Sequence, residues 1–565
     1  MTNYEFFLVH SLDKVLPDRR PEMLSEPVLN GFHGETLSIQ LAYTCTDDGL
    51  GEGSTLFTVE VISDTADAVI RKVELVPCSY PCHDTWDDNY LVTTPGLYPD
   101  LLVPAEKGEP IKAVPGQWRS LWIDVDAVPG THSIVLRIWD AAHQLIRELA
   151  FFAEVLNAKL PKQKLIHTQW FHGDCLADYY QVPVFSEAHW RILENFMRSA
   201  VRHGINTILT PIFTPPLDTA MGGERTTIQL VKIYYEEEVY RFDFSLLNRW
   251  ISLCEKTGIQ YLEMAHLFTQ WGAICAPKIL VCVDGIQEKR FGWHTSATGK
   301  EYSDFLHSFL PALKDVLAQR GWLERTFFHI SDEPHDREVE TYTAARECVK
   351  DLLADCKVMD ALSSYAIYQK GVIDRPVVSV DQIHPFLEAG VPHLWAYYCT
   401  AQSIDVPNRF ISMPSPRNRI LGTLLYYYSI EGFLHWGFNF YNSQKSIEHI
   451  DPYKVTDAGG AFPSGDPFLV YPAPDGTAYD SIRGMVLRQA LNDLRALNYL
   501  EETAGRPYVM KMLAGLSRGV LTFAKYPREK AFFESMRKAV YDSIQEHEAI
   551  CTKTSQLQTS RDSRL

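Results

Sequence analysis

The chain has 565 residues, of which 46% are hydrophobic, and a formal net charge of −18. This is longer than one ordinary domain, so we expect two or three domains, and the composition is that of a folded globular protein. The acidic balance argues against a nucleic-acid partner, because binding a phosphate backbone requires a basic face.

The first twenty residues contain no basic segment followed by an apolar one, so no signal peptide is predicted. No apolar run is long enough to span a bilayer. The eleven cysteines are scattered along the chain. Without an export signal, these cysteines predict reduced thiols and a cytoplasmic protein. A leader removed from the chain would leave the same pattern.

Residues 1–156 have the pattern of an all-β domain. Short runs that alternate apolar and polar residues are separated by turn-forming clusters, and this spacing is typical of a β-sandwich. The alternating runs lie at 37–41, 56–61, 118–125 and 133–139, and turn clusters lie at 47–49 and 128–131. We therefore predict an N-terminal β-sandwich.

From 157–161 onward, apolar strands alternate with amphipathic helices, which predicts βα units and a parallel sheet. Helices with an apolar stripe are expected at 187–203 and 336–356. Eight strands are expected, at 165–171, 206–213, 259–266, 326–330, 357–361, 377–380, 393–398 and 432–438. Eight units within 157–500 predict a (β/α)8 TIM barrel with long loops. A doubly wound open sheet is the alternative, but the GxGxxG and P-loop signatures are absent.

The last part of the chain, 501–565, has a helical pattern. An amphipathic helix is expected at 529–550, and the polar end at 551–565 is expected to fray. The predicted fold class is therefore multidomain. It consists of a β-sandwich at 1–156, a TIM barrel at 157–500 and a helical C-terminal extension at 501–565.

Two adjacent acids, Asp332 and Glu333, follow the apolar run 326–330 and precede Pro334. Pro334 cannot extend a central strand and disfavours helix at Glu333, so the strand ends as the acids arrive. Successive side chains of a strand point to opposite faces, so both acids can face one pocket only where the strand breaks up. Barrel enzymes keep their chemistry at such strand ends. Taken alone, the motif fits a structural role equally well, in which Asp332 caps the helix after Asp336 and Glu333 is a solvated loop residue.

The other predicted strands end in carboxylates, imidazoles, amides and large aromatic rings. This mixture suits a sugar, because its C–H faces stack on aromatic rings and its hydroxyls need polar partners. Mid-strand aromatics such as Phe328 and Phe433 are expected in the core. The strand-end set is His167, Trp170, His172, Asp174, Glu263, His266, Trp271, Trp395, Tyr397, Tyr398, His435, Trp436, Asn439, Tyr441 and Asn442.

A metal site is an alternative use of the histidines. His167, His172 and His266 could converge, but there is no HxH or HExxH pair and the loops offer no closed ligand set. We therefore predict no metal and no other cofactor. A nucleophilic serine or cysteine is not expected either, since the sequence has no GxSxG and no catalytic cysteine signature.

Several stretches together resemble glycoside hydrolase family 123, the β-N-acetylgalactosaminidases and their relatives. The resemblance covers most of the chain. It implies an N-terminal β-sandwich, a catalytic TIM barrel and retaining hydrolysis assisted by the substrate's own acetamido group. The stretches lie at 95–100, 119–125, 263–272, 331–334, 395–399, 432–439, 465–468 and 471–472.

The resemblance places the family's adjacent Asp-Glu pair on Asp332 and Glu333. Asp332 would orient the acetamido N–H and stabilise developing positive charge, and Glu333 would act as general acid and then as general base. The neighbouring negative charges keep one acid protonated near neutral pH. Tyr397 or Tyr398 would hydrogen-bond the acetamido carbonyl. The expected substrate-binding residues are His266, Trp271, Tyr397, Tyr398, Trp436, Asn439 and Tyr441, with Trp436 stacking on the ring.

The resulting hypothesis is exo-acting release of terminal β-linked N-acetylgalactosamine from a glycan or a glycolipid head group. N-acetylglucosamine is the alternative sugar. It differs from N-acetylgalactosamine in the orientation of O4, which an enzyme recognises by one or two hydrogen bonds that the sequence does not reveal. A non-catalytic carbohydrate-binding protein is the alternative from another class, and the intact Asp332–Glu333 pair argues against it. A homodimer is the assembly considered.

Overall fold

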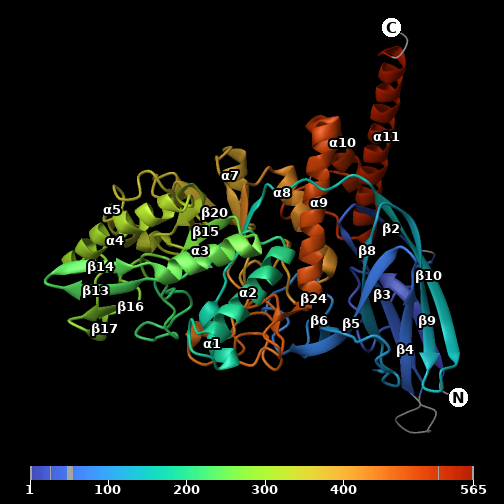
Figure 1. Ribbon diagram of the computed structural model, residues 1–565, viewed down its shortest axis with the longest axis horizontal. Helices are drawn as coiled ribbons and strands as arrows, with labels where there is room; N and C mark the ends of the chain where they lie inside the picture. The colour runs from blue at the N-terminus through green and yellow to red at the C-terminus, as the bar shows by residue number, and fades with distance from the viewer. Residues whose placement is uncertain (1–2, 26, 47–54, 520, 563–565) are drawn as a thin grey trace.

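The structure is a computed structural model that describes residues 3–25, 27–46, 55–519 and 521–562. A strand-rich region lies beside a closed barrel, and helices of the C-terminal part stand between and over them (Figure 1). This arrangement confirms the predicted fold class. The turn predicted at 47–49 lies outside the described residues.

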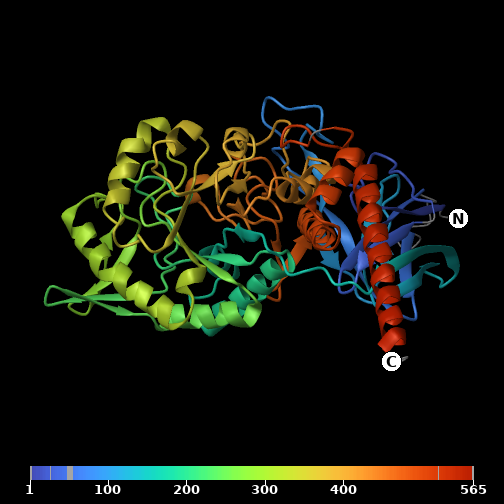
Figure 2. The same ribbon diagram turned by 90° about the horizontal axis from the view of Figure 1, so that it is seen from above.

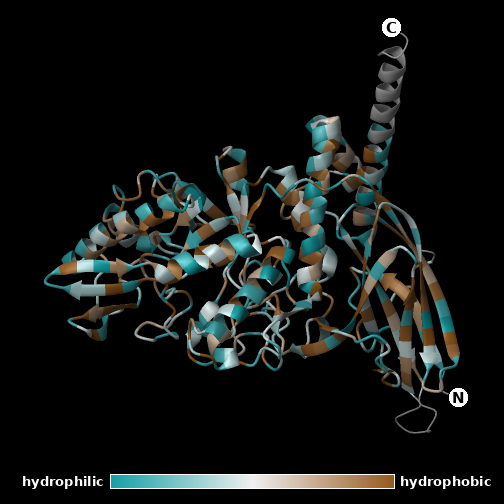
Figure 3. Ribbon diagram, in the orientation of Figure 1, coloured by the Kyte–Doolittle hydropathy of each residue, from teal (hydrophilic) through white to brown (hydrophobic). Residues whose placement is uncertain are grey.

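Two sheets pack face to face in the sandwich. In the first sheet, β1, β3, β8, β5 and β6 lie in this order, and in the second the order is β2, β10, β9, β4 and β7. Buried residues alternate with less buried ones along β9, and hydrophobic and hydrophilic residues are interspersed along the sandwich strands (Figure 3). On β9 the inward residues are Ile134, Leu136 and Ile138, all fully buried. The strands are β1 (Tyr4–His10), β2 (Val28–Phe32), β3 (Thr36–Cys45), β4 (Leu56–Ile62), β5 (Ala66–Cys78), β6 (Gly96–Pro104), β7 (Ile111–Lys112), β8 (Arg119–Ala127), β9 (Gly130–Asp140) and β10 (Leu145–Leu156).

Eight parallel strands form the closed barrel, in chain order. The last strand pairs with both its predecessor and the first strand, so the ring is complete and the open-sheet alternative is wrong. Each strand lies within a segment predicted from the sequence, apart from one start that comes two residues earlier, at Arg375. The strands are β11 (Ile166–Gln169), β12 (Thr207–Thr210), β15 (Tyr261–Met264), β18 (Thr326–Phe328), β19 (Lys357–Ala361), β20 (Arg375–Ser379), β21 (Trp395–Tyr397) and β22 (Gly432–His435).

Helices between the strands cover the barrel. Helix α2 (Glu187–Arg202) begins where the Ser186 side chain accepts a hydrogen bond from the His189 N–H, and it buries its apolar stripe. Helix α5 (Val339–Glu347) ends earlier than predicted, because bonds such as Val349 N–H to Arg346 C=O tighten the chain after it. The others are α1 (Gly173–Tyr180), α3 (Ser245–Thr257), α4 (Lys300–Gln319), α6 (Tyr365–Tyr368), α7 (His384–Glu388) and α8 (Ser415–Tyr427), with short 3-10 helices at Leu323–Arg325, Asp336–Glu338 and Gln444–Ser446.

A small four-stranded sheet was not anticipated from the sequence. Its strands come from the loops after β12 and β15, and it lies at the end of the molecule far from the sandwich (Figures 1 and 2). The order is β14, β13, β16 and β17, where β13 is Lys232–Glu236, β14 is Val239–Asp243, β16 is Ile279–Val283 and β17 is Ile286–Phe291. Long barrel loops therefore carry structure of their own.

Two late strands join the sandwich to the barrel. Strand β24 (Ala478–Ser481) pairs with β6, and β23 (Tyr471–Pro472) pairs with β24, so residues beyond the barrel complete the first sheet. Behind this edge, Arg483 donates to both carboxylate oxygens of buried Asp100, at 2.9 and 2.8 Å. The domain limits at 156 and 500 remain predictions.

Three helices follow, α9 (Ile482–Ala504), α10 (Arg506–Ser517) and α11 (Lys530–Asp562). Helix α9 lies between the barrel and the sandwich in both views (Figures 1 and 2). Helix α11 contacts β2, and it reaches into the segment for which the sequence predicts a frayed end. Across the described residues, none of the helices combines the length and apolarity that a bilayer crossing needs.

Candidate active site

The predicted acid pair lies just beyond β18, and the chain after β15 runs beside it. The N–H groups of Leu267 and Phe268 donate to the carbonyls of His329 and Ile330, at 3.1 and 3.0 Å. Farther along, the Trp271 N–H lies 3.4 Å from the Asp332 carbonyl. The loop after β15 thus continues the strand pairing and holds the backbone of the acid pair at the carboxyl end of the barrel.

Asp332 is buried, with 7% of its surface exposed. Its Oδ2 accepts a hydrogen bond of 2.8 Å from Gln270 Nε2, and the Gln270 oxygen accepts in turn from the Asp218 N–H. Burial, followed by the negative charge of Glu333, raises the pKa of Asp332 to about 8. Asp332 therefore keeps its proton at neutral pH.

Glu333 is only partly buried, and its backbone lies in the left-handed region with φ of 45°. A side chain other than glycine pays roughly 1–2 kcal/mol for this conformation. Such strain recurs at functional sites. Here this conformation interrupts the alternation of side chains that an extended strand would impose on the two consecutive acids.

Tyr397, the last residue of β21, holds the Glu333 side chain. Its hydroxyl donates to Glu333 Oε1 at 2.5 Å, and it lies 3.0 Å from Ser363 Oγ, which therefore donates to it. Tyr397 is buried in the barrel interior with Phe327 and Trp395. One hydroxyl thus connects the ends of three strands, β18, β19 and β21.

A buried ion cluster lies below the pair. His329 donates through Nδ1 to Asp360 at 2.9 Å and through Nε2 to Glu263 at 2.7 Å. Burial alone would lower the pKa of His329, but the hydrogen bonds and charges of the two carboxylates outweigh it and raise that pKa to about 10. Thr168 Oγ1 and Trp170 Nε1 also donate to Glu263. His329 is therefore an imidazolium held by two carboxylates, at the base of the candidate site.

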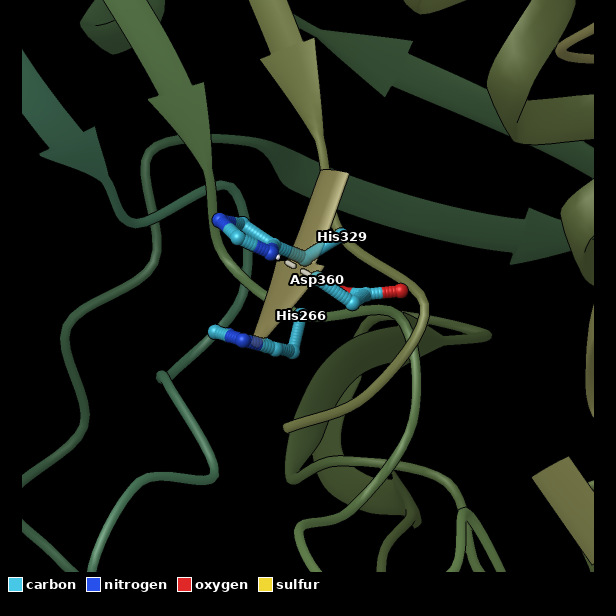
Figure 4. A group of neighbouring side chains, drawn as sticks. All are labelled: His266, His329 and Asp360. Carbon is cyan, nitrogen blue, oxygen red and sulfur yellow. Dashed lines mark hydrogen bonds and ion pairs between the residues drawn. The ribbon is translucent and has the colours of Figure 1, made fainter. Parts of the chain in front are cut away.

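His266 stacks on His329, with ring centroids 4.2 Å apart (Figure 4). It is fully buried, and neither ring nitrogen has a hydrogen-bond partner in the described part of the chain. Burial and the charge of His329 lower the pKa of His266 well below its usual value, so this ring is neutral. His266 therefore lies beside His329 at the base of the candidate site, and its predicted contact with substrate remains a proposal.

His266, His329 and Asp360 are close enough together to suggest a metal site. The donor set does not fit one, because both nitrogens of His329 already donate to carboxylates and leave no lone pair for a ligand bond. The other two histidines considered as ligands have separate partners. His167 Nδ1 bonds the Gly204 carbonyl and His172 Nε2 bonds that of Trp436.

Trp436 follows β22 and packs, partly buried, against the interior cluster that contains Phe327, Trp395 and Tyr397. Its Nε1 donates to Asp466 Oδ2 at 2.8 Å, and Phe440 and Phe462 pack edge-on against its ring. Burial raises the pKa of Asp466 to about 7. The indole is thus fixed in orientation while part of its surface stays exposed. Trp271, in the loop beside Asp332, is 40% exposed.

Three predicted contact residues have other surroundings. Tyr398, the residue after β21, is buried against Phe433 and His435. The Asn439 amide bonds the backbone N–H and C=O of His172, and Tyr441 donates to the Val470 carbonyl. The polar groups of Asn439 and Tyr441 are thus engaged inside the protein.

Sequence reasoning named Glu263 but not its partner His329, and it missed Gln270, Asp360 and Ser363 as neighbours of the site. A polar residue inside an apolar strand was the available signal for Asp360, the fourth residue of β19. Gln270 and Ser363 lie in loops, where no periodic pattern shows which way a side chain points.

Comparison with protein families matches the model described as the glycoside hydrolase 123 catalytic domain to residues 170–500. Among solved structures, a family 123 glycoside hydrolase from Clostridium perfringens, studied for glycolipid glycan hydrolysis, aligns with a TM-score of 0.72. The identity is 15%, over 98% of this chain and 100% of that one, so the likeness shows the fold. A β-glucuronidase from Parabacteroides merdae aligns with a TM-score of 0.28 at 9% identity, over 88% of this chain and 52% of that one, which is too distant to support an argument. The comparison with curated proteins gives no match.

Proposed function

The chain belongs to glycoside hydrolase family 123, and we propose that it is an exo-acting, retaining enzyme that releases terminal β-linked N-acetylgalactosamine by substrate-assisted catalysis. The observation that carries the mechanism is the adjacency of Asp332 and Glu333 after β18. The two carboxyl groups of an ordinary retaining pair lie about 5 Å apart on either side of the scissile bond. Consecutive residues at one strand end do not enclose a sugar ring in this way. The acetamido oxygen of the substrate therefore takes the place of an enzyme nucleophile.

In the first step the acetamido oxygen attacks the anomeric carbon while the bond to the leaving oxygen breaks. Asp332 accepts the acetamido N–H and stabilises the positive charge of the oxazolinium ion. In the free protein, burial favours a proton on Asp332. The bound N–H and the developing cation favour ionised Asp332 instead, so the proton is available on Glu333 for the leaving oxygen.

In the second step, ionised Glu333 takes a proton from water as the water attacks the anomeric carbon. The bond to the acetamido oxygen breaks, which restores the acetamido group and the original configuration after two inversions. Glu333 regains its proton at the same time, ready for the next turnover.

The surrounding residues support this assignment. The hydrogen bond from Tyr397 fixes one oxygen of Glu333, so that the other can face the leaving group. Trp436, with its indole fixed by Asp466, is suited to stack on the sugar ring. A glycolipid head group is the proposed natural aglycone class, in line with the glycan hydrolysis described for the Clostridium perfringens protein.

The decisive experiment uses p-nitrophenyl β-glycosides of N-acetylgalactosamine, N-acetylglucosamine and galactose, with mass spectrometry after incubation with a 2-fluoro glycoside. We expect turnover of the N-acetylgalactosaminide, little turnover of the plain galactoside and no covalent label on any carboxylate. Preferential turnover of the N-acetylglucosaminide would change the sugar and keep the mechanism. A stoichiometric adduct on an Asp or Glu would show that the enzyme supplies the nucleophile and would overturn the mechanism.

A further inference from the structure

A cavity of about 320 Å3 lies where the sandwich, the segment leading into the barrel and helix α9 meet. Its walls come from residues 33–35, 159–163, 201–204 and 488–495. The second segment leads into β11 and the third leads into β12, so the cavity lies at the amino ends of the barrel strands. Asp332 and Glu333 follow the carboxyl end of a strand, at the opposite end of the barrel.

Four cationic residues line this cavity: Lys159, Arg202, Arg488 and Arg495. Over the described ranges of the chain, no carboxylate lies in ion-pair contact with any of them. Glu35 is the acidic member of the lining, and Arg537 already donates to it at 2.5 Å. Four unpaired cations thus gather in a chain whose net charge is −18.

The two arginines of α9 bind neutral acceptors. Arg495 donates to the Pro161 carbonyl at 2.8 Å, and Arg488 donates to Thr36 Oγ1 at 2.8 Å. Burial lowers the pKa of Arg495, the negative charge of Glu35 opposes this, and the like charge of Arg488 adds a smaller lowering. Their positions, seven residues apart, place both on one face of the helix. The two charges repel each other, and the charges of Glu35 and Asp480 act against this repulsion.

A purely structural account covers part of this arrangement. Arg202 lies in the last turn of α2, where a cation complements the helix dipole, and Arg495 fastens the segment before the barrel to α9. Arg488 in turn fastens α9 to Thr36 and acts on the charge of Asp480. These roles do not explain why Lys159 faces the same cavity as the three arginines. Convergence of cations from separate segments is the usual form of an oxyanion site.

We propose that this cavity binds a small molecule through a phosphate or sulfate group. A tetrahedral oxyanion offers several acceptors to converging guanidinium and ammonium donors, and such charge-assisted bonds are the strong ones. The side chains of Gln163 and Asn492 add polar groups for the body of the ligand. The volume is that of a small-molecule site. Because the cavity lies at the end of the barrel opposite the acid pair, the ligand is distinct from the sugar substrate.

The test measures binding by calorimetry and thermal unfolding of the full chain. The probes are inorganic phosphate, inorganic sulfate and a hexose 6-phosphate, each against sodium chloride at equal ionic strength. We expect saturable binding of at least one probe and a rise in the unfolding midpoint of about 2 °C or more at saturation. Binding of phosphate without sulfate, or the reverse, would identify the group that the site prefers.

The variant pair separates this site from general salt effects. Lys159→Gln with Arg202→Gln removes two exposed lining charges, and we expect it to weaken binding about tenfold or more. Lys162→Gln with Arg191→Gln is the matched control, since it removes the same charge from the same segment and helix outside the lining. Absence of saturable binding for all three probes, or equal binding by both double variants, would overturn the proposal.

Discussion

The hydroxyl of Tyr397 donates a 2.5 Å hydrogen bond to the carboxylate of Glu333, whereas its neighbour Tyr398 faces away from the acids. Tyr397→Phe removes one donor and leaves the ring in place. We expect kcat to fall about tenfold or more, the usual effect of losing a hydrogen bond to a charged group. Tyr398→Phe is the control and should retain nearly full kcat. Equal effects of the two changes on steady-state kinetics would contradict a specific role for Tyr397.

Glu333→Gln should abolish turnover of substrates with poor leaving groups. Activated aryl glycosides should lose much less in the first step, because a good leaving group needs little protonation. The measurement compares p-nitrophenyl and alkyl glycosides of the same amino sugar. An equal loss for both substrates would argue against the general-acid role.

Asp332→Asn keeps the size of the side chain and removes its charge. We expect kcat to fall roughly a hundredfold or more, the scale of losing an electrostatic partner of the transition state. Circular dichroism should show an intact fold. Turnover near that of the unaltered protein would refute the proposed role of Asp332.

The same substitution should change how stability depends on pH. The pKa of Asp332 is about 8 in the folded protein, against 3.8 for the ordinary side chain. Between these values the unfolded chain has lost a proton that the folded protein keeps, so this group makes the free energy of unfolding decrease as pH rises. We expect Asp332→Asn to have an unfolding midpoint a few degrees above the unaltered protein at about pH 8. The difference should shrink towards pH 4, and a constant difference would contradict the raised pKa.

Removing the imidazolium of His329 should be costly for the fold. His329→Gln leaves two buried carboxylates without their cation, and breaking such a buried ion cluster costs about 3–5 kcal/mol. His266→Phe keeps the stacked ring and loses nitrogens that have no partner, so it should cost far less. Denaturant unfolding measures both. Equal destabilisation, together with a loss of stability on chelation, would instead indicate that these residues hold a metal.

The barrel was predictable because its strands are short apolar runs with helical stripes between them, and local pattern determines such elements. The acid pair was predictable because Pro334 ends the strand beside it. The sequence did not predict which of Tyr397 and Tyr398 faces the acids. Strand alternation places the two side chains on opposite sides, but it does not determine which of them points to the acids. Gln270 reaches Asp332 from a loop, and loop side chains follow no period.

Non-local pairing was the other limit of sequence reasoning. The chain after the barrel gives no sign that residues 471–481 add two strands to a sheet formed by the first part of the chain. The small sheet of β13, β14, β16 and β17 likewise joins two hairpins from different barrel loops. Even where propensity favours a strand, it does not identify the partner.

The pairing of β24 with β6 also limits how this protein can be divided. A fragment that ends at residue 156 would expose the backbone groups of Leu101 and Leu102 along a bare strand edge. Such an edge recruits other chains, so we expect that fragment to aggregate when it is produced alone. A gene rearrangement that transfers the sandwich to another protein would therefore also have to transfer strand β24, which lies more than 300 residues after the sandwich in the sequence.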